Sequence, residues 1–210
     1  KHLEWYVYRN AVLLAAKTDC EAASDDVCKY LSHPHPRVRE EAISALSHFR
    51  GKSAMLDFVP LLSDTDASVR RKAIALLARF QCRVPLFLST LANSVKAGPG
   101  KPGAVPEPVA LAALEAIKSV GVFESDGVDI RAPLLRNLDR EDSKLKQWFK
   151  KKQKVVNDDR FRCAVLDTLA VIGDEAVATR LKPVLRDSSP PVRAKAAAAI
   201  KSIRERGKTS

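Results

Sequence analysis

The residues best suited to bind an anionic ligand lie in one basic segment, residues 144–154, in which six lysines surround Trp148 and Phe149. Lysine ammonium groups neutralise phosphates and release counterions, and an indole ring stacks on an unpaired base. The same composition suits an acidic protein surface, a membrane surface, or a solvated insertion whose aromatic residues cover neighbouring helices. The candidate residues of this basic loop are Lys144, Lys146, Trp148, Lys150, Lys151, Lys152 and Lys154.

Two histidines stand close together in His33-Pro34-His35-Pro36, a spacing that raises the question of a metal site. No Cys, Asp or Glu adjoins them, and the prolines fit a turn, so we predict a turn and no metal. The sequence contains no G-x-S-x-G, no H-E-x-x-H and no Gly-rich phosphate loop. We therefore predict a protein without catalytic residues, metal or cofactor.

The elements that carry these residues repeat along the chain. Val38-Arg39, Val69-Arg70 and Val192-Arg193 are each followed by small or apolar residues at +3, +4, +6 and +7 from the arginine. These offsets share one face of a helix, because 3.6 residues complete a turn. Weaker copies begin at Arg9 and Arg162, and a further copy has Ala110 at the arginine position.

A second apolar helix accompanies each copy, which predicts about eleven helices and no strand. Repeated pairs of helices of this kind stack on one another and form a solenoid. Two of the distances between successive copies of the repeat are longer than the others, which predicts two insertions. One is at about 96–106, which is rich in glycine and proline, and the other is at about 139–156, which is charged. Gly51, Gly121 and Gly173 fit helix ends that need a left-handed residue.

The segment running from Gly173-Asp174-Glu175 through Pro191-Val192-Arg193 resembles the short HEAT-like repeat first described in phycobilisome lyases. Residues 52–82 fit the same pattern, and residues 5–10 resemble a phrase common in bacterial HEAT-repeat proteins. The resemblance implies an all-α fold, an α-solenoid (superhelix) of about five to six helical hairpins. We expect residues 1–210 to form a single HEAT-like repeat domain that is an excised part of a longer protein.

The resemblance also implies a structural ladder, in which the repeated arginines bind acidic groups and turn carbonyls between units. A cationic stripe for an anionic ligand is the alternative reading of the same arginines. The ladder residues are Arg39, Arg70, Arg193, Asp64 and Asp187. A protein partner is expected on the concave face of the arginine-bearing helices, at Arg37, Glu40, Ser44, Arg71, Glu115 and Asp167.

Trp5, Tyr6 and Tyr8 near the start of the chain are interpreted as packing residues, with Tyr8 on the core register; a ligand-binding aromatic site is the alternative interpretation. The formal net charge is +11, and the four cysteines lack C-x-x-C spacing, which indicates reduced cysteines and the cytoplasm. No apolar run reaches the length of a membrane span.

These features favour a non-enzymatic scaffold or regulatory module that binds a protein. The alternative is a DNA-binding protein related to the alkylpurine DNA glycosylases, which share this fold; the basic composition supports it. Chaperoning of a bilin pigment is a third interpretation, implied by the resemblance to the lyases alone.

Overall fold

The computed structural model describes residues 4–98, 104–121, 130–138 and 159–208, and every regular element in these ranges is helical. This confirms the predicted all-α fold of consecutively packed helical hairpins. No helix in the described part of the chain has the length and apolarity needed to cross a bilayer. The α-helices are α1 (Trp5–Lys17), α2 (Ser24–Lys29), α3 (Pro36–Phe49), α4 (Met55–Phe58), α5 (Ala67–Arg79), α6 (Pro85–Ser94), α7 (Glu107–Val120), α8 (Arg131–Arg136), α10 (Asp159–Ile172), α11 (Glu175–Leu181) and α12 (Pro190–Gly207).

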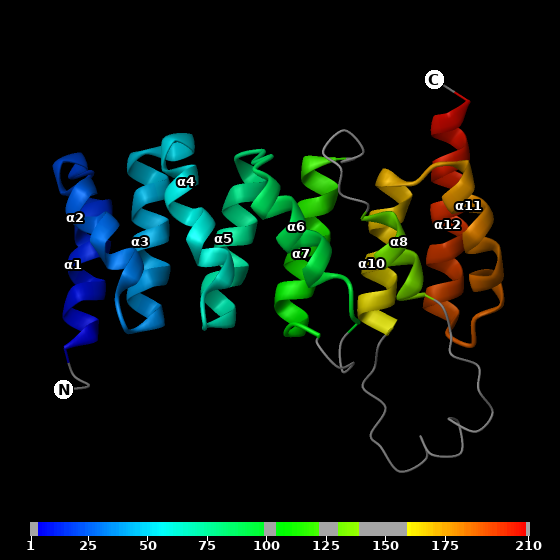
Figure 1. Cartoon of the computed structure of the whole chain (residues 1–210), viewed down its shortest axis with the longest axis horizontal. Helices are drawn as coiled ribbons and strands as arrows, with labels where there is room; N and C mark the ends of the chain where they lie inside the picture. The colour runs from blue at the N-terminus through cyan, green and yellow to red at the C-terminus, as the bar shows by residue number, and fades with distance from the viewer. Residues whose placement is uncertain (1–3, 99–103, 122–129, 139–158, 209–210) are drawn as a thin grey trace, which may run out of the picture. The chain divides into compact units, whose positions relative to one another are not determined.

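The chain divides into two compact units, residues 1–87 and 88–210, with the boundary inside α6. In the first unit α3 packs against α1 on one side and α5 on the other (Figure 1). The short helices α2 and α4 continue into 3₁₀ turns, Tyr30–Ser32 and Val59–Ser63, which pack on α3 and α5 respectively. The three longer helices therefore form one layer, and the short helices form the other.

The second unit repeats this arrangement around α10, which packs against both α7 and α12. Helices α8 and α11 contact each other, and α11 continues into the 3₁₀ turn Lys182–Arg186 that packs on α12. The predicted insertion at 139–156 lies outside the described residues. Of the insertion at 96–106, the described residues on either side of 99–103 are not helical.

Local chemistry explains where the longer helices begin. Pro36 and Pro190 occupy first-turn positions, where the missing N–H has no helical partner to lose. The Asp66 carboxylate caps α5 by accepting hydrogen bonds from the backbone N–H groups of Ser68 and Val69, at 2.8 and 3.3 Å. His35 caps α3 through its Nδ1 atom.

The predicted core positions follow the arginine register. In α3 the side chains at +3, +4, +6 and +7 are Ala42, Ile43, Ala45 and Leu46, and all are fully buried. The register fails in the first and last helices of the described chain, α1 and α12. Tyr8 is 40% exposed, so its prediction as a core residue is wrong, and Val12 is the buried residue of α1. In α12 the +4 residue, Ala197, is exposed.

One of the three helix-end glycines has a different role from the one predicted. Gly51 and Gly121 have φ values of 51° and 88°, as a left-handed helix end requires, but Gly173 does not have a positive φ. A Cβ at Gly173 would lie 2.5 Å from the Leu169 carbonyl oxygen and 2.8 Å from Cδ1 of Ile203. Gly173 is needed because a Cβ there would overlap the backbone carbonyl of Leu169 in α10, and would also press on Ile203 of α12.

Candidate functional site

Arg39 connects two successive turns of the first unit. Its Nε and Nη2 atoms donate to the Asp64 carboxylate at 2.7 and 2.6 Å, and its Nη1 atom donates to the carbonyls of His33 and Pro34. Both charged side chains are about nine-tenths buried. Arg70 then donates to the backbone carbonyls of Asp64 and Thr65. We call Arg39, Asp64 and Arg70 the first arginine clamp.

The second unit contains the same arrangement at the same offsets. Arg162 donates to both oxygens of the Asp187 carboxylate, and Arg193 donates to the carbonyls of Asp187 and Ser188 at 2.7 and 3.0 Å. In both clamps the carboxylate stands 25 residues after the arginine that it binds. Arg162 was not predicted as a ladder residue, although it occupies the arginine position of a weaker repeat. These contacts favour the structural interpretation of the repeated arginines over a cationic stripe.

A polar pocket opens on the layer formed by α1, α3 and α5. We call it the N-terminal pocket; it is lined by Arg9, Pro36, Arg37, Glu40, Glu41, Asp66, Ser68 and Lys72. Two residues of the predicted partner face, Arg37 and Glu40, therefore lie here together. The three cations and three carboxylates balance, so the pocket suits a partner surface of mixed charge.

Bonds between neighbouring helices hold the pocket together. Arg9 on α1 lies 3.5 Å from the Glu41 carboxylate on α3. The Ser68 hydroxyl on α5 lies within hydrogen-bond distance of the Glu40 and Asp66 carboxylates. The Ser68 hydroxyl and backbone N–H hold the pKa of Asp66 below its usual value.

Lys72 of α5 is a partly buried lysine in this pocket. Its Nζ atom donates to the Glu40 backbone carbonyl at 2.7 Å. Burial lowers the pKa of the Lys72 ammonium, and the Glu41 and Glu40 carboxylates oppose that effect. A partly buried ammonium on a carbonyl has donor capacity left for a partner oxygen, because it carries three N–H groups.

The other residues of the predicted partner face are dispersed. Ser44 donates to the Glu40 carbonyl on α3, and Arg71 is exposed on α5. In the second unit, Glu115 binds Lys118 on its own helix, and the Lys195 ammonium on α12 donates to Asp167. The basic loop residues from Lys144 to Lys154 lie outside the described residues.

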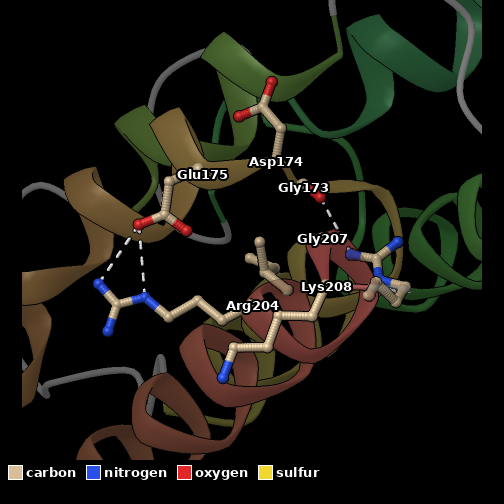
Figure 2. Close-up of a pocket in the computed structure, with 8 residues that line it drawn as sticks. Gly173, Asp174, Glu175, Arg204, Gly207 and Lys208 are labelled. Carbon is tan, nitrogen blue, oxygen red and sulfur yellow. Dashed lines mark hydrogen bonds and ion pairs between the residues drawn. The ribbon is translucent and has the colours of Figure 1, made fainter. Parts of the chain in front are cut away.

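A second pocket lies beside the end of α12 and contains Gly173, Asp174, Glu175 and Arg204 (Figure 2). Figure 2 shows Arg204 facing Glu175, which it binds at 3.3 Å. The carboxylate of Asp174 accepts from the Val177 backbone N–H, which holds its pKa below the usual value, and pairs with Arg131 at 2.7 Å. The charged groups at this pocket are therefore engaged in pairs, Arg204 with Glu175 inside it and Asp174 with Arg131 outside its lining.

An aromatic cluster lies at the α1 edge of the first unit, formed by Trp5, Tyr8, Tyr30, His33 and His35. Trp5 stacks on His35 with ring centroids 4.1 Å apart, and Tyr8 lies 5.8 Å from Tyr30 and 5.2 Å from His33. The packing predicted for Trp5 is thus made with a turn of its own unit. Among the described residues, no group of three or more His, Cys, Asp or Glu side chains forms a metal site.

Two of the four cysteines have thiols that burial makes less acidic. Burial raises the pKa of the Cys28 and Cys163 thiols above the ordinary value, and neighbouring carboxylates add to the effect. A raised pKa lowers the fraction of reactive thiolate. Neither thiol therefore has the environment of an activated nucleophile.

Comparison with known proteins supports part of the sequence interpretation. A family model of HEAT repeats matches residues 1–78, which lie in the first unit. Among solved structures, the chain is similar to an engineered protein, a Northeast Structural Genomics Consortium target, at 19% identity and a TM-score of 0.46; the alignment covers 96% of this chain and 90% of that one. No curated protein matches the chain. The phycobilisome-lyase type of repeat stays a prediction.

Proposed function

We propose that the chain is a non-enzymatic HEAT-like module that binds a protein partner on the face of α1, α3 and α5. The observation that carries the proposal is the N-terminal pocket, in which side chains from the three neighbouring helices α1, α3 and α5 gather on one polar surface. Arg37 lines this pocket as an exposed cation on α3, and Arg71 is an exposed cation on α5, next in sequence to the pocket residue Lys72. The clamp at Arg39 and Asp64 fixes the turns from which both helices begin.

The charge of this face favours a protein over a nucleic acid. Residues 4–87 hold twelve Lys or Arg and ten Asp or Glu, so most of the net charge of +11 belongs to the rest of the chain. Duplex DNA is bound mainly by cations that neutralise its phosphates. Three carboxylates in the N-terminal pocket would repel those phosphates.

Capture of partners from a cell lysate tests the proposal. The immobilised chain is compared with a double charge reversal, Arg37→Glu with Arg71→Glu, and the captured proteins are quantified. The matched control reverses two exposed lysines in 3₁₀ turns away from α1, α3 and α5, Lys52→Glu in the first unit with Lys182→Glu in the second. Recovery should fall with the arginine reversals and persist with the lysine reversals; equal recovery from all three proteins would refute this face.

DNA binding through the basic composition is the second candidate function, and a salt titration separates it from the first. Phosphate contacts make the affinity fall steeply with salt. On duplex DNA the logarithm of the binding constant falls by about 0.9 per phosphate contact for each tenfold rise in salt concentration. The candidate fails if a labelled duplex does not bind at low salt. Binding that survives the Arg37 and Arg71 reversals would place the DNA site away from the first unit's polar face.

A further inference from the structure

The aromatic cluster gathers a large share of the chain's few aromatic and imidazole rings. It holds one of two tryptophans and two of four histidines, and all three tyrosines of the chain lie on α1 or in the 3₁₀ turn Tyr30–Ser32. The core of the unit does not require the tyrosines. Tyr6 and Tyr8 are 43% and 40% exposed, and Tyr30 is only partly covered.

Hydrogen bonds fix the orientation of both histidine rings. The His33 Nδ1 atom accepts from the His35 backbone N–H at 3.0 Å, and the His35 Nδ1 atom accepts from the Arg37 backbone N–H at 3.3 Å. A neutral imidazole that accepts at Nδ1 carries its proton on Nε2. Each ring therefore presents an N–H donor, and so do the Trp5 indole and the tyrosine hydroxyls.

The combination of aromatic rings and hydrogen-bond donors suits a peptide in the polyproline II conformation. A polyproline II segment has no internal hydrogen bonds, so its carbonyl groups are free to accept, and its proline rings pack on aromatic side chains. The cluster offers aromatic rings together with N–H and O–H donors. Its rings are also held in place, because Trp5 stacks on His35 between Pro34 and Pro36. A preformed site loses little conformational entropy on binding.

The aromatic cluster continues into the N-terminal pocket. Arg37 lines the pocket, and its guanidinium carbon lies 5.7 Å from the centre of the Trp5 ring. Pro36, next to His35, also lines the pocket. One extended segment of a partner could therefore contact the rings and the polar residues in succession.

We infer that the aromatic cluster binds a proline-containing segment of the partner in the polyproline II conformation. The inference rests on the proposed function, since it names the kind of segment that the partner contributes. Tyr8, Tyr30 and Trp5 supply the ring surfaces. The Nε2 atoms of His33 and His35 donate to peptide carbonyls.

A polarisation titration of the full chain with fluorescein-labelled decaproline tests this inference. A Gly-Ser peptide of equal length is the control ligand. Tyr8→Ala and Trp5→Ala should each weaken decaproline binding by about tenfold or more, because each removes one aromatic contact. Tyr8→Phe keeps the ring and should retain most of the affinity. Leu14→Ala changes a 61% exposed residue of the same helix outside the cluster and should leave binding unchanged.

Three results would overturn the inference. The first is that the folded chain does not bind decaproline at about 1 mM peptide. The second is that the Gly-Ser peptide binds as well as decaproline. The third is that the chain binds single-stranded oligothymidylate in place of decaproline and that Tyr8→Ala abolishes this binding. Circular dichroism of each variant checks that α1 stays folded. If partner capture depends on Arg37 and Arg71 but is unchanged by Tyr8→Ala, the proposed function survives and the proline-segment inference fails.

Discussion

Asp64→Ala should be among the most damaging single substitutions in the first unit. The carboxylate of Asp64 accepts from Arg39 at 2.7 and 2.6 Å and from the Asp66 backbone N–H at 2.8 Å. After the substitution the Arg39 guanidinium keeps only the carbonyls of His33 and Pro34. Its Nε and Nη2 groups then remain in a site where the side chain is 10% exposed.

The expected loss follows from the burial of this pair. Removing one partner of a buried ion pair costs about 3–5 kcal/mol, because an uncompensated charge remains. Because Arg39 keeps its two hydrogen bonds to carbonyls, we expect Asp64→Ala to lower the free energy of unfolding by about 3 kcal/mol, near the lower end of that range. For a chain of this size that corresponds to a fall in Tm of about 6–12 °C.

Urea unfolding followed by far-UV circular dichroism measures the change in the free energy of unfolding. Asp25→Ala is the matched control, because Asp25 also binds an arginine, Arg50, but its side chain is 93% exposed. An exposed pair contributes at most about 1 kcal/mol. The double replacement Arg39→Met with Asp64→Leu removes both charges and should restore most of the lost stability.

Two results would refute the reasoning. A loss of less than about 1 kcal/mol for Asp64→Ala, indistinguishable from Asp25→Ala, would show that water solvates the Arg39 guanidinium. A double replacement less stable than Asp64→Ala would show that the pair, and not the removal of the stranded charge, decides stability.

Three further changes test other features of the fold. Gly173→Ala should destabilise by about 1–3 kcal/mol, since its Cβ would overlap the Leu169 carbonyl, whereas Gly207→Ala, with open space around its Cβ, should be neutral or slightly stabilising by thermal unfolding. Asp66→Ala should cost about 1 kcal/mol in urea, because α5 loses the side-chain cap that binds Ser68 and Val69. Lys72→Met should raise the urea midpoint at neutral pH: burial lowers the lysine pKa, so the folded chain binds this proton less tightly than the unfolded chain does. That gain should shrink as the pH rises towards 10.5, and a constant gain would contradict the burial argument.

The sequence points to most of the clamp residues because a repeat fixes chemistry to a register, but it did not lead us to Arg162, which occupies that register in a weaker copy. Arg39, Arg70 and Arg193 recur at one position, and Asp64 and Asp187 recur six residues before the last two. The sequence does not show which arginine each carboxylate binds. Asp64 is near Arg70 in sequence, but its carboxylate binds Arg39 and only its backbone carbonyl binds Arg70. The turn directs the side chain back to the preceding hairpin.

Features that depend on the distance between helices were not predictable in this way. The N-terminal pocket combines Arg9, Glu41 and Lys72 from three helices; all three lie in or beside the repeated arginine motif, but the motif does not predict that their side chains meet. Periodicity marked Tyr8 as buried, but the main neighbour of α1 in the described chain is α3, so the other side of α1 stays exposed. Gly173 lies at a helix end as predicted, yet the close approach of the Leu169 carbonyl, with Ile203 of α12 beside it, explains this glycine, and left-handed geometry does not.

The first arginine clamp also explains why the polar face is found where it is. Arg39 binds the turn before α3 through two carbonyls and the turn before α5 through Asp64, so it fixes the starting points of both helices relative to each other. Glu40 and Ser68 lie within the first turns that follow and approach each other across the two helices. A buried ion pair is a weak source of stability but a strict geometric constraint. In this unit the constraint aligns two exposed helix starts, and such alignment is what a binding surface built from successive repeats requires.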